Sequence, residues 1–208
     1  MIDFMGASET EFRLVLLRHG ETAWSAARKH TGRTDVPLTP LGEQQARTAR
    51  SLLTDLALHD PLVLTSPKRR AVHTAELAGL PDARPDDDLV EWDYGDYEGL
   101  TTPQIQETAP GWTIFTGEVP GGESAAQVQA RADRVLAAVE PELARRDVVL
   151  VGHGHFSRAL IARWVEFDVR EGRRFFMSTA GITVLGHDHQ ARSILAHNLV
   201  PTLSGANR

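Results

Sequence analysis

LVLLRHGET, residues 14–22, is the stretch that decides the fold, because four large aliphatic side chains stand directly before charged and polar ones. A continuous apolar run of this kind predicts a strand that is covered on both faces, as in the parallel sheets of α/β proteins. Ligands of open α/β sheets bind beyond the carboxyl ends of the strands. We therefore expect Arg18 and His19, which follow the run, at a functional edge of the sheet.

His19 is expected to act as a nucleophile toward an anion. The neighbouring guanidinium group of Arg18 disfavours a second positive charge on the imidazole, so a role mainly as a base suits His19 less well. Gly20 lets the backbone approach an oxyanion, and Thr22 adds a hydroxyl donor. The motif alone is weakly specific, and a strand that merely ends in Arg18 and His19 remains an alternative at this point.

Composition narrows the class of protein. The chain has 208 residues, of which 41% are hydrophobic and 24% charged, and this fits one domain with a substantial core. A formal net charge of −6 argues against nucleic-acid or membrane-surface binding, which needs a basic face. The absence of cysteine excludes disulfides, thiolate metal ligands and cysteine nucleophiles. Residues 1–11 do not resemble a signal peptide and are expected to be flexible. No apolar run approaches about 18 residues, so we expect a cytoplasmic protein without a membrane partner.

Helical and strand-like segments alternate along the rest of the chain. A capping residue followed by proline predicts a helix start, and apolar residues at helical spacing predict its buried face. The expected helices start at Thr39-Pro40, at Ser66-Pro67 with a stop at Gly79, at the capping box Ser124–Gln127 with a kink or break at Pro141 before Leu143, and at Ser157 with an end at Val165. The other expected strands are 62–64, 148–151 and a closing hairpin of 183–185 with 194–195.

A second strand end carries polar residues like those after the first. The apolar run 148–151 leads into Gly152-His153-Gly154-His155, another histidine and glycine sequence. Arg70 falls in the first turn of the helix that follows strand 62–64. Because the carboxyl ends of parallel strands lie at one edge of a sheet, these residues are expected to share one site with His19.

Three loop segments are expected to surround this site. Residues 91–99, EWDYGDYEG, place acids between aromatics and glycines, which favours a site, with a solvated surface turn as the alternative. Residues 23–38 are polar and either wrap an anion or are solvated. Residues 100–122 are rich in proline and glycine and are interpreted as an insert over the pocket, whose Trp112 and Phe115 either floor that pocket or pack beneath their own segment.

Taken together, these motifs resemble the histidine phosphatase superfamily, also called phosphoglycerate mutase-like. The matching pieces, in order, are LLRHGETAW, the stretch from Thr31 to Ala46, SPKRRAVHTA, EWDYGDYEGL, PGGES and VGHGHFSRA. The resemblance covers nearly the whole chain and implies a single histidine phosphatase domain over 1–208. It also implies a three-layer α/β/α sandwich on a mostly parallel central sheet, and a covalent phosphohistidine mechanism without a metal or organic cofactor.

The resemblance assigns a role to each catalytic position. His19 matches the nucleophile, and Glu91 matches the carboxyl group that serves as general acid and base. Arg18, Arg70 and His153 match a clamp on the phosphoryl group. These roles agree with the chemistry, because a phosphoryl-transfer site must mainly neutralise the oxygens of the group in flight and supply one proton to the leaving oxygen.

The same resemblance predicts the pocket lining. The positions expected to bind substrate are Thr22, Ser25, Thr31, Gly32 and His155. Ser25 stands where many relatives carry asparagine. Lys29 stands where family members often have arginine, with Arg28 adjacent, and which of these two side chains reaches the phosphate stays open.

The function predicted first is hydrolysis of phosphomonoesters, in the branch of broad-specificity acid phosphatases and sugar bisphosphatases. Its substrate would be a small phosphorylated metabolite, and because family members are often dimers, a homodimer is one expectation. A mutase or phosphotransferase is the alternative, which the short insert 100–122 disfavours because it leaves water access. A metal-binding protein built on His153 with His155 and on His187 with His189, and a catalytically inactive scaffold, are further hypotheses that fit the motifs less well.

Overall fold

Six strands form one sheet in the order β3-β2-β4-β1-β5-β6. The computed structural model describes residues 12–200, so the expectation of flexibility at 1–11 lies outside the described residues. The strands are β1 Leu14–Arg18, β2 Leu62–Thr65, β3 Arg84–Pro85, β4 Val148–Gly152, β5 Ile182–Asp188 and β6 Ala191–Leu199. The α-helices are α1 Ala23–Ala26, α2 Pro40–Asp55, α3 Arg69–Leu77, α4 Thr102–Gln106, α5 Ala125–Val139 and α6 Gly154–Trp164. Three 3-10 turns complete them, η1 Asp87–Leu89, η2 Gly95–Tyr97 and η3 Val169–Arg174.

The sheet is mostly parallel, as predicted. Strand β1 lies between β4, to which it is parallel, and β5, to which it is antiparallel. Strands β2 and β3 continue the parallel part beyond β4, and β6 pairs antiparallel with β5 as the closing hairpin. Arg18 stands opposite Gly152 in the β1–β4 register, so His19 and His153 leave the sheet at the same edge.

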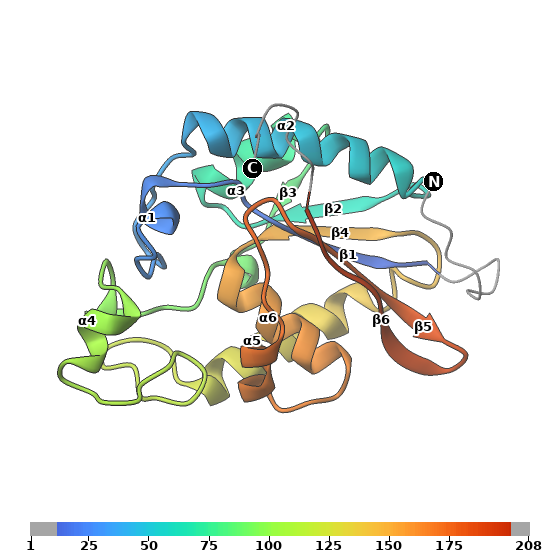
Figure 1. The fold of residues 1–208 in the computed structure, drawn as a ribbon. Coiled ribbons are helices and arrows are strands. Elements are labelled where there is room, and N and C mark those ends of the chain that lie inside the picture. Colours follow the sequence, from blue (N-terminus) through green and yellow to red (C-terminus); the bar gives the residue numbers. More distant parts are fainter. Residues whose placement is uncertain (1–11, 201–208) are drawn as a thin grey trace.

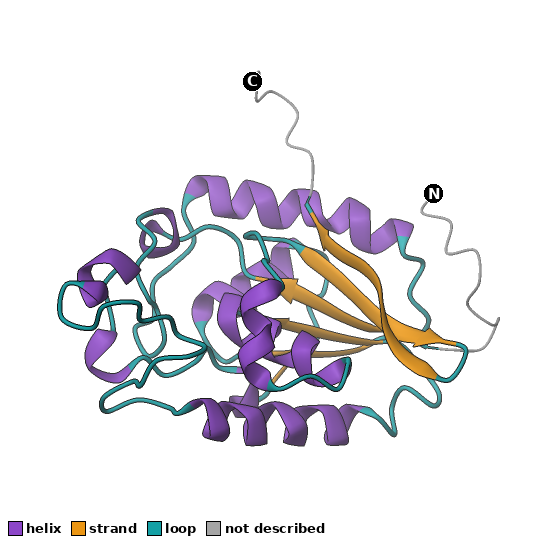
Figure 2. Ribbon diagram, turned by 60° about the horizontal axis from the view of Figure 1, so that its bottom comes forward, coloured by secondary structure: helices purple, strands orange, loops and turns teal. Residues whose placement is uncertain are grey.

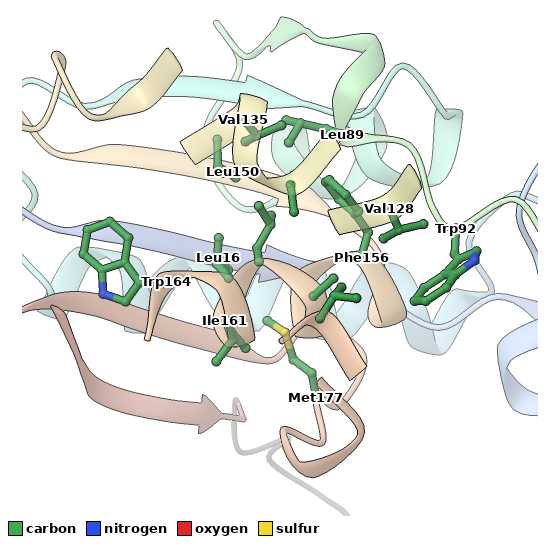
Figure 3. Close-up of a cluster of buried hydrophobic side chains, with 14 of the residues drawn as sticks. Leu16, Leu89, Trp92, Val128, Val135, Leu150, Phe156, Ile161, Trp164 and Met177 are labelled. Atoms are coloured by element: carbon green, nitrogen blue, oxygen red, sulfur yellow. The ribbon is translucent and has the colours of Figure 1, made fainter. Parts of the chain in front are cut away.

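Helices cover both faces of the sheet, which confirms the three-layer sandwich (Figures 1 and 2). Successive side chains of β1 point to opposite faces of the sheet, and both sets need an apolar cover. Leu14 and Leu16 belong to the apolar cluster that includes residues of α5 and α6, which Figure 3 shows around Leu16. Val15 and Leu17 belong to the cluster with α2 and α3 on the opposite face. All four side chains are fully buried, and each contributes roughly 1.5–3 kcal/mol to the free energy of unfolding.

Helix α3 begins later than the sequence predicts. The sequence predicts Ser66 as its cap and Pro67 as its first residue, but the N-cap residue is Lys68 and the first helical residue is Arg69. Ser66 still continues the strand, because its backbone N–H donates to the carbonyl oxygen of Val151. Its hydroxyl group contacts Nε2 of His153 at 2.7 Å and accepts from the backbone N–H of Lys68 only at a long 3.4 Å, and the helix begins at Arg69.

Two other helices differ from expectation at their ends. Helix α5 ends at Val139, and Pro141 and Leu143 lie in the turn that follows, because proline cannot supply the N–H that a helix interior needs. Helix α6 begins at Gly154, three residues before the expected start at Ser157. The first turn of α6 is therefore built from the motif residues themselves.

The segments 23–38 and 100–122, which are expected to surround the site, lie beyond the carboxyl ends of the parallel strands. Each contains a short helix, α1 and α4, and Figure 1 shows both helices on the side of the molecule opposite the turn between β5 and β6. Trp112 and Phe115 are 5% and 2% exposed, and the indole N–H of Trp112 donates to the carbonyl oxygen of Glu118 in the same segment. Of the two expectations for these aromatics, packing beneath their own segment describes Trp112.

Among residues 12–200, no helix combines the length and the apolar character needed to cross a membrane.

Candidate active site

His19 follows β1 directly and is 5% exposed. Its Nδ1 lies 2.7 Å from the carbonyl oxygen of Gly20, and because a carbonyl oxygen only accepts, Nδ1 carries the hydrogen. Burial, followed by the charges of Arg70 and Arg18, holds the pKa of His19 well below its usual value. The imidazole is therefore neutral near pH 7 and carries its lone pair on Nε2.

Arg18 presents an unmet donor beside His19. Its Nη1 donates to the carbonyl oxygen of Met177 at 2.6 Å. Its Nε is the one buried side-chain nitrogen or oxygen that finds no hydrogen-bond partner within the described part of the chain. A Cβ at Gly154 would lie 3.1 Å from Arg18 Cζ, so glycine at this helix start leaves room for the guanidinium group. Arg18 is half-buried, and a cation with an unpaired buried N–H is stabilised by a nearby anionic ligand.

Arg70 and His153 form a buried pair next to His19. Arg70 Nε donates to His153 Nδ1 at 3.2 Å, so the neutral His153 carries its hydrogen on Nε2, which contacts the hydroxyl group of Ser66 at 2.7 Å. Burial is the main reason that the pKa of His153 lies well below its usual value. The rings of His19 and His153 are 5.2 Å apart.

The remaining donors of Arg70 are occupied by the loop that follows α1. Its Nη1 donates to the carbonyl oxygen of Thr34, and its Nη2 donates to that of Thr31. Neither Arg70 nor His153 is among the residues that line the large cavity described below. The structure therefore brings both to His19 and gives both a structural partner as well.

Glu91 is held by the start of α6. Its Oε1 accepts hydrogen bonds from the backbone N–H groups of Trp92 and Phe156, and its Oε2 accepts one from His155. The N–H groups of a first helical turn have no partner within the helix, so a carboxylate satisfies them. This arrangement fixes the orientation of the Glu91 carboxyl group, which is 7% exposed.

A cavity of about 530 Å³ lies beside His19, Arg18 and Glu91. His19 and Glu91 both line it, as do four cationic side chains, Arg18, Arg28, Lys29 and Arg158. Its carboxylates are Glu91 and Glu21, so its formal charge is two positive units, whereas the whole chain has a net charge of −6. Local charge therefore favours an anionic ligand in a protein that is acidic as a whole.

Three of the five residues expected to bind substrate line this cavity, namely Ser25, Thr31 and His155. The other two do not. The hydroxyl group of Thr22 caps α1 by accepting from the backbone N–H of Ser25. Gly32 donates its N–H to Glu98, and a Cβ there would lie 2.7 Å from the carbonyl oxygen of Trp92. Gly32 thus allows its loop to pack closely against the loop that contains Trp92. Arg28 and Lys29 both line the cavity.

Several lining residues were not expected from the sequence. Arg158 lies four residues after Gly154 in α6, and this helical spacing was the available signal. Tyr94 follows Glu91 by three residues within the stretch 91–99, whose mixture of acids and aromatics favours a site. Residues 176–179 reach the cavity only through the packing of the chain after η3, for which the local sequence gives no signal.

The metal-site hypothesis finds no geometric support. Within residues 12–200, no three histidine, aspartate or glutamate side chains converge in a way that could hold a metal ion. Nδ1 of His153 accepts a hydrogen bond from Arg70. His189 contacts the neighbouring Asp188 on the hairpin.

Comparison with known proteins gives a consistent result. The family model described as histidine phosphatase superfamily (branch 1) matches residues 14–200. An acid phosphatase from Mycobacterium tuberculosis is 53% identical over 182 residues, which is 88% of this chain and 90% of that protein. A sedoheptulose 1,7-bisphosphatase from Saccharomyces cerevisiae is 34% identical over 188 residues, covering 76% of this chain and 69% of that protein.

Solved structures agree. The structure from the open reading frame Rv3214 of Mycobacterium tuberculosis superposes with a TM-score of 0.90 at 51% identity and covers 92% of this chain and 99% of that one. The match to the family model spans all six strands and the residues that surround His19. The chain therefore belongs to the histidine phosphatase superfamily, branch 1, and is a histidine-dependent phosphatase.

Proposed function

We propose that the chain hydrolyses small phosphorylated metabolites as a phosphomonoesterase of the acid phosphatase type, through a phosphohistidine at His19. The observation that carries this proposal is the protonation state of His19. Its Nδ1–H is committed to the carbonyl oxygen of Gly20, which leaves the Nε2 lone pair available at a cavity lined by cationic side chains. An uncharged imidazole with a free nitrogen is the form that can attack phosphorus.

In the first half-reaction, a bond forms between His19 Nε2 and phosphorus while the bond from phosphorus to the ester oxygen breaks. The leaving oxygen takes a proton from Glu91, whose carboxyl group lines the same cavity. Arg18 lines the cavity, and the positive charge of its guanidinium group offsets charge on the transferred phosphoryl group. Arg70 and His153 hold that side of the site in place and complete the proposed clamp.

In the second half-reaction, water attacks the phosphorus atom of phosphohistidine. Glu91, now ionised, accepts a proton from that water, and the bond between phosphorus and Nε2 breaks to release inorganic phosphate. One carboxyl group therefore serves both steps, and each step returns it to the state that the other requires. The two half-reactions, as proposed, need no metal ion or organic cofactor.

The competing proposal is phosphoryl transfer to a second metabolite, which uses the same groups. Water access favours hydrolysis, and the exposed residues Ala26, Arg28 and Phe176 are among those that line the cavity beside His19. The test is a panel of phosphorylated metabolites in which substrate loss and phosphate release are both measured. We expect one phosphate released for each substrate consumed. Substrate loss with formation of a new phosphate ester in place of free phosphate would establish transfer.

A further inference from the structure

A second cavity, of about 290 Å³, adjoins the active-site cavity. Four residues, His30, Thr102, His155 and Arg158, line both. The rest of its wall comes from 113–116 in the segment 100–122 and from Arg173 in η3. The second cavity therefore extends the active site away from His19, beneath the segment that follows Leu100.

The electrostatic character of the second cavity is positive. Its lining includes Arg158 and Arg173 and no carboxylate. Arg173 already pairs with Glu171 at 3.0 Å. Arg158 has no carboxylate within salt-bridge distance in the described part of the chain. Its Nε and Nη2 donate to the carbonyl oxygens of Gly172 and Arg173, and its guanidinium carbon lies 4.7 Å from the ring centre of Phe115.

These contacts fix Arg158 and leave one of its nitrogens unused. Among residues 12–200, Nη1 of Arg158 has no hydrogen-bond acceptor. Because Arg18 Nε is the one buried side-chain donor without a partner there, Nη1 of Arg158 retains access to solvent. Arg158 lines both cavities, and Nη1 is the nitrogen of its guanidinium group that no protein acceptor occupies.

His155 supplies a second unused donor. Its Nδ1 lies 2.6 Å from the hydroxyl oxygen of Tyr94, which is 1% exposed. The Tyr94 hydroxyl has no other partner in the described chain, and we assign it as the donor to Nδ1, so that the neutral imidazole carries its hydrogen on Nε2. Burial raises the pKa of Tyr94 and lowers that of His155, which keeps both groups neutral. Like Arg158 Nη1, the His155 Nε2–H has no protein acceptor and keeps solvent access.

We propose that the second cavity binds an anionic group at the end of the substrate opposite the transferred phosphate, with Arg158 Nη1 and His155 Nε2 as its donors. The substrate class is a phosphomonoester with a second anion, either a carboxylate or another phosphate. This inference rests on the proposed phosphatase function. Arg158 and His155 are then binding residues that determine specificity, and Tyr94 is a positioning residue that selects the His155 tautomer.

The test separates this inference from the proposed function by measuring binding, independent of turnover. Titration calorimetry on the full-length His19→Ala variant compares two pairs of ligands. Fructose 1,6-bisphosphate against fructose 6-phosphate tests a second phosphate, and 6-phosphogluconate against glucose 6-phosphate tests a carboxylate. We expect the second anion to tighten Kd at least about tenfold in one pair, which is typical of hydrogen bonds to charged groups.

Adding Arg158→Met should reduce this gain to less than about threefold. The matched control is Arg163→Met in the same helix, because Arg163 pairs with Asp133, and both lie outside the lining of either cavity. The control should keep the gain. No gain in either pair, or a gain that survives Arg158→Met, would overturn the inference. Absence of phosphate release by the unmodified protein would instead overturn the proposed function.

The tautomer gives a readout that does not depend on affinity. Imidazole ¹⁵N chemical shifts should show His155 protonated at Nε2 and unprotonated at Nδ1. Tyr94→Phe should mix the two tautomers and weaken the gain from the second anion. An imidazole protonated at Nδ1 in the unmodified protein would contradict the assignment of His155 as a donor.

Discussion

At the scale of single residues, the site is determined by hydrogen bonds that set which nitrogen of each histidine is protonated. His19 donates from Nδ1 to a carbonyl oxygen, whereas His153 accepts at Nδ1 from Arg70. The two rings therefore carry their hydrogens on different nitrogens, although they are only 5.2 Å apart. His19 is left with a free lone pair, and His153 is left with a donor that contacts Ser66.

This difference leads to a prediction for His19→Ala. The variant should lose essentially all phosphatase activity, because no other described side chain at the cavity presents an unprotonated imidazole nitrogen next to Arg18. Reactions with labelled substrate that are quenched in alkaline denaturant, where phosphohistidine is stable, should trap a phosphohistidine in the unmodified protein and no label in the variant. Persisting turnover without His19, or label on a serine, would refute the covalent mechanism.

The His153→Ala variant serves as a comparison for His19→Ala, because it removes a buried imidazole from the same site and leaves His19, the proposed nucleophile, in place. It should slow turnover and still allow labelled protein to be trapped.

Glu91 gives a second prediction at this scale. Glu91→Gln removes the transferable proton and keeps most of the size and polarity of the side chain. An alkyl leaving group needs protonation more than an aryl one, so kcat/KM should fall much further for alkyl phosphates, by about 10²-fold or more. The measurement is the ratio of kcat/KM for an alkyl and an aryl phosphate in both proteins. Equal losses would mean that Glu91 positions phosphate or water and does not act as the general acid.

At the scale of elements, the sequence predicts strands and helices well where a local pattern decides them. The runs 14–17 and 148–151 form β1 and β4, and the capping box of Ser124 and Gln127 starts α5. Prediction failed where a tertiary contact competes with a local one. Ser66 has the sequence context of a helix cap, but its hydroxyl contacts His153, a residue 87 positions away in the chain, so α3 starts after it.

The capping box of α5 allows a test of an element apart from the site. The Ser124 hydroxyl accepts from the backbone N–H of Gln127, and the Gln127 side chain accepts from the backbone N–H of Ser124. Ser124→Ala should lower the free energy of unfolding by about 1 kcal/mol. Urea unfolding measures this loss, and kcat should not change because Ser124 lies outside both cavity linings. Unchanged stability would show that the cap contributes nothing.

At the scale of the whole molecule, the site is assembled from segments that the sequence separates widely. His19, Glu91 and His153 were predictable because each stands in a motif at a strand end or in an acidic and aromatic loop. The contact of Arg18 with Met177 was not, because it depends on how the chain returns after η3. The two adjoining cavities depend in the same way on packing between 100–122 and α6, which no local pattern encodes.

Buried histidines also make the stability of the whole molecule depend on pH. Burial lowers the pKa of His30 to about 4, and it holds the pKa values of His19, His153 and His155 well below their usual value. Below about pH 6.5 the unfolded chain therefore binds more protons than the folded one, so stability falls as pH decreases. For His30 this loss is complete near pH 4 and amounts to about 3 kcal/mol.

Activity and stability should consequently have different pH optima. Acidification below pH 6.5 weakens the fold, yet the pKa of His19 is depressed by burial and by Arg70 and Arg18, so the proposed nucleophile stays uncharged as the fold begins to weaken. We expect kcat/KM, measured over short times, to peak on the acidic side of the pH at which urea unfolding shows greatest stability. His30→Gln should reduce the pH dependence of stability between pH 6.5 and 4 by about 1.4 kcal/mol per pH unit. If the variant keeps the original slope, protonation of His30 is not coupled to folding, and the acid loss of stability comes from other titrating groups.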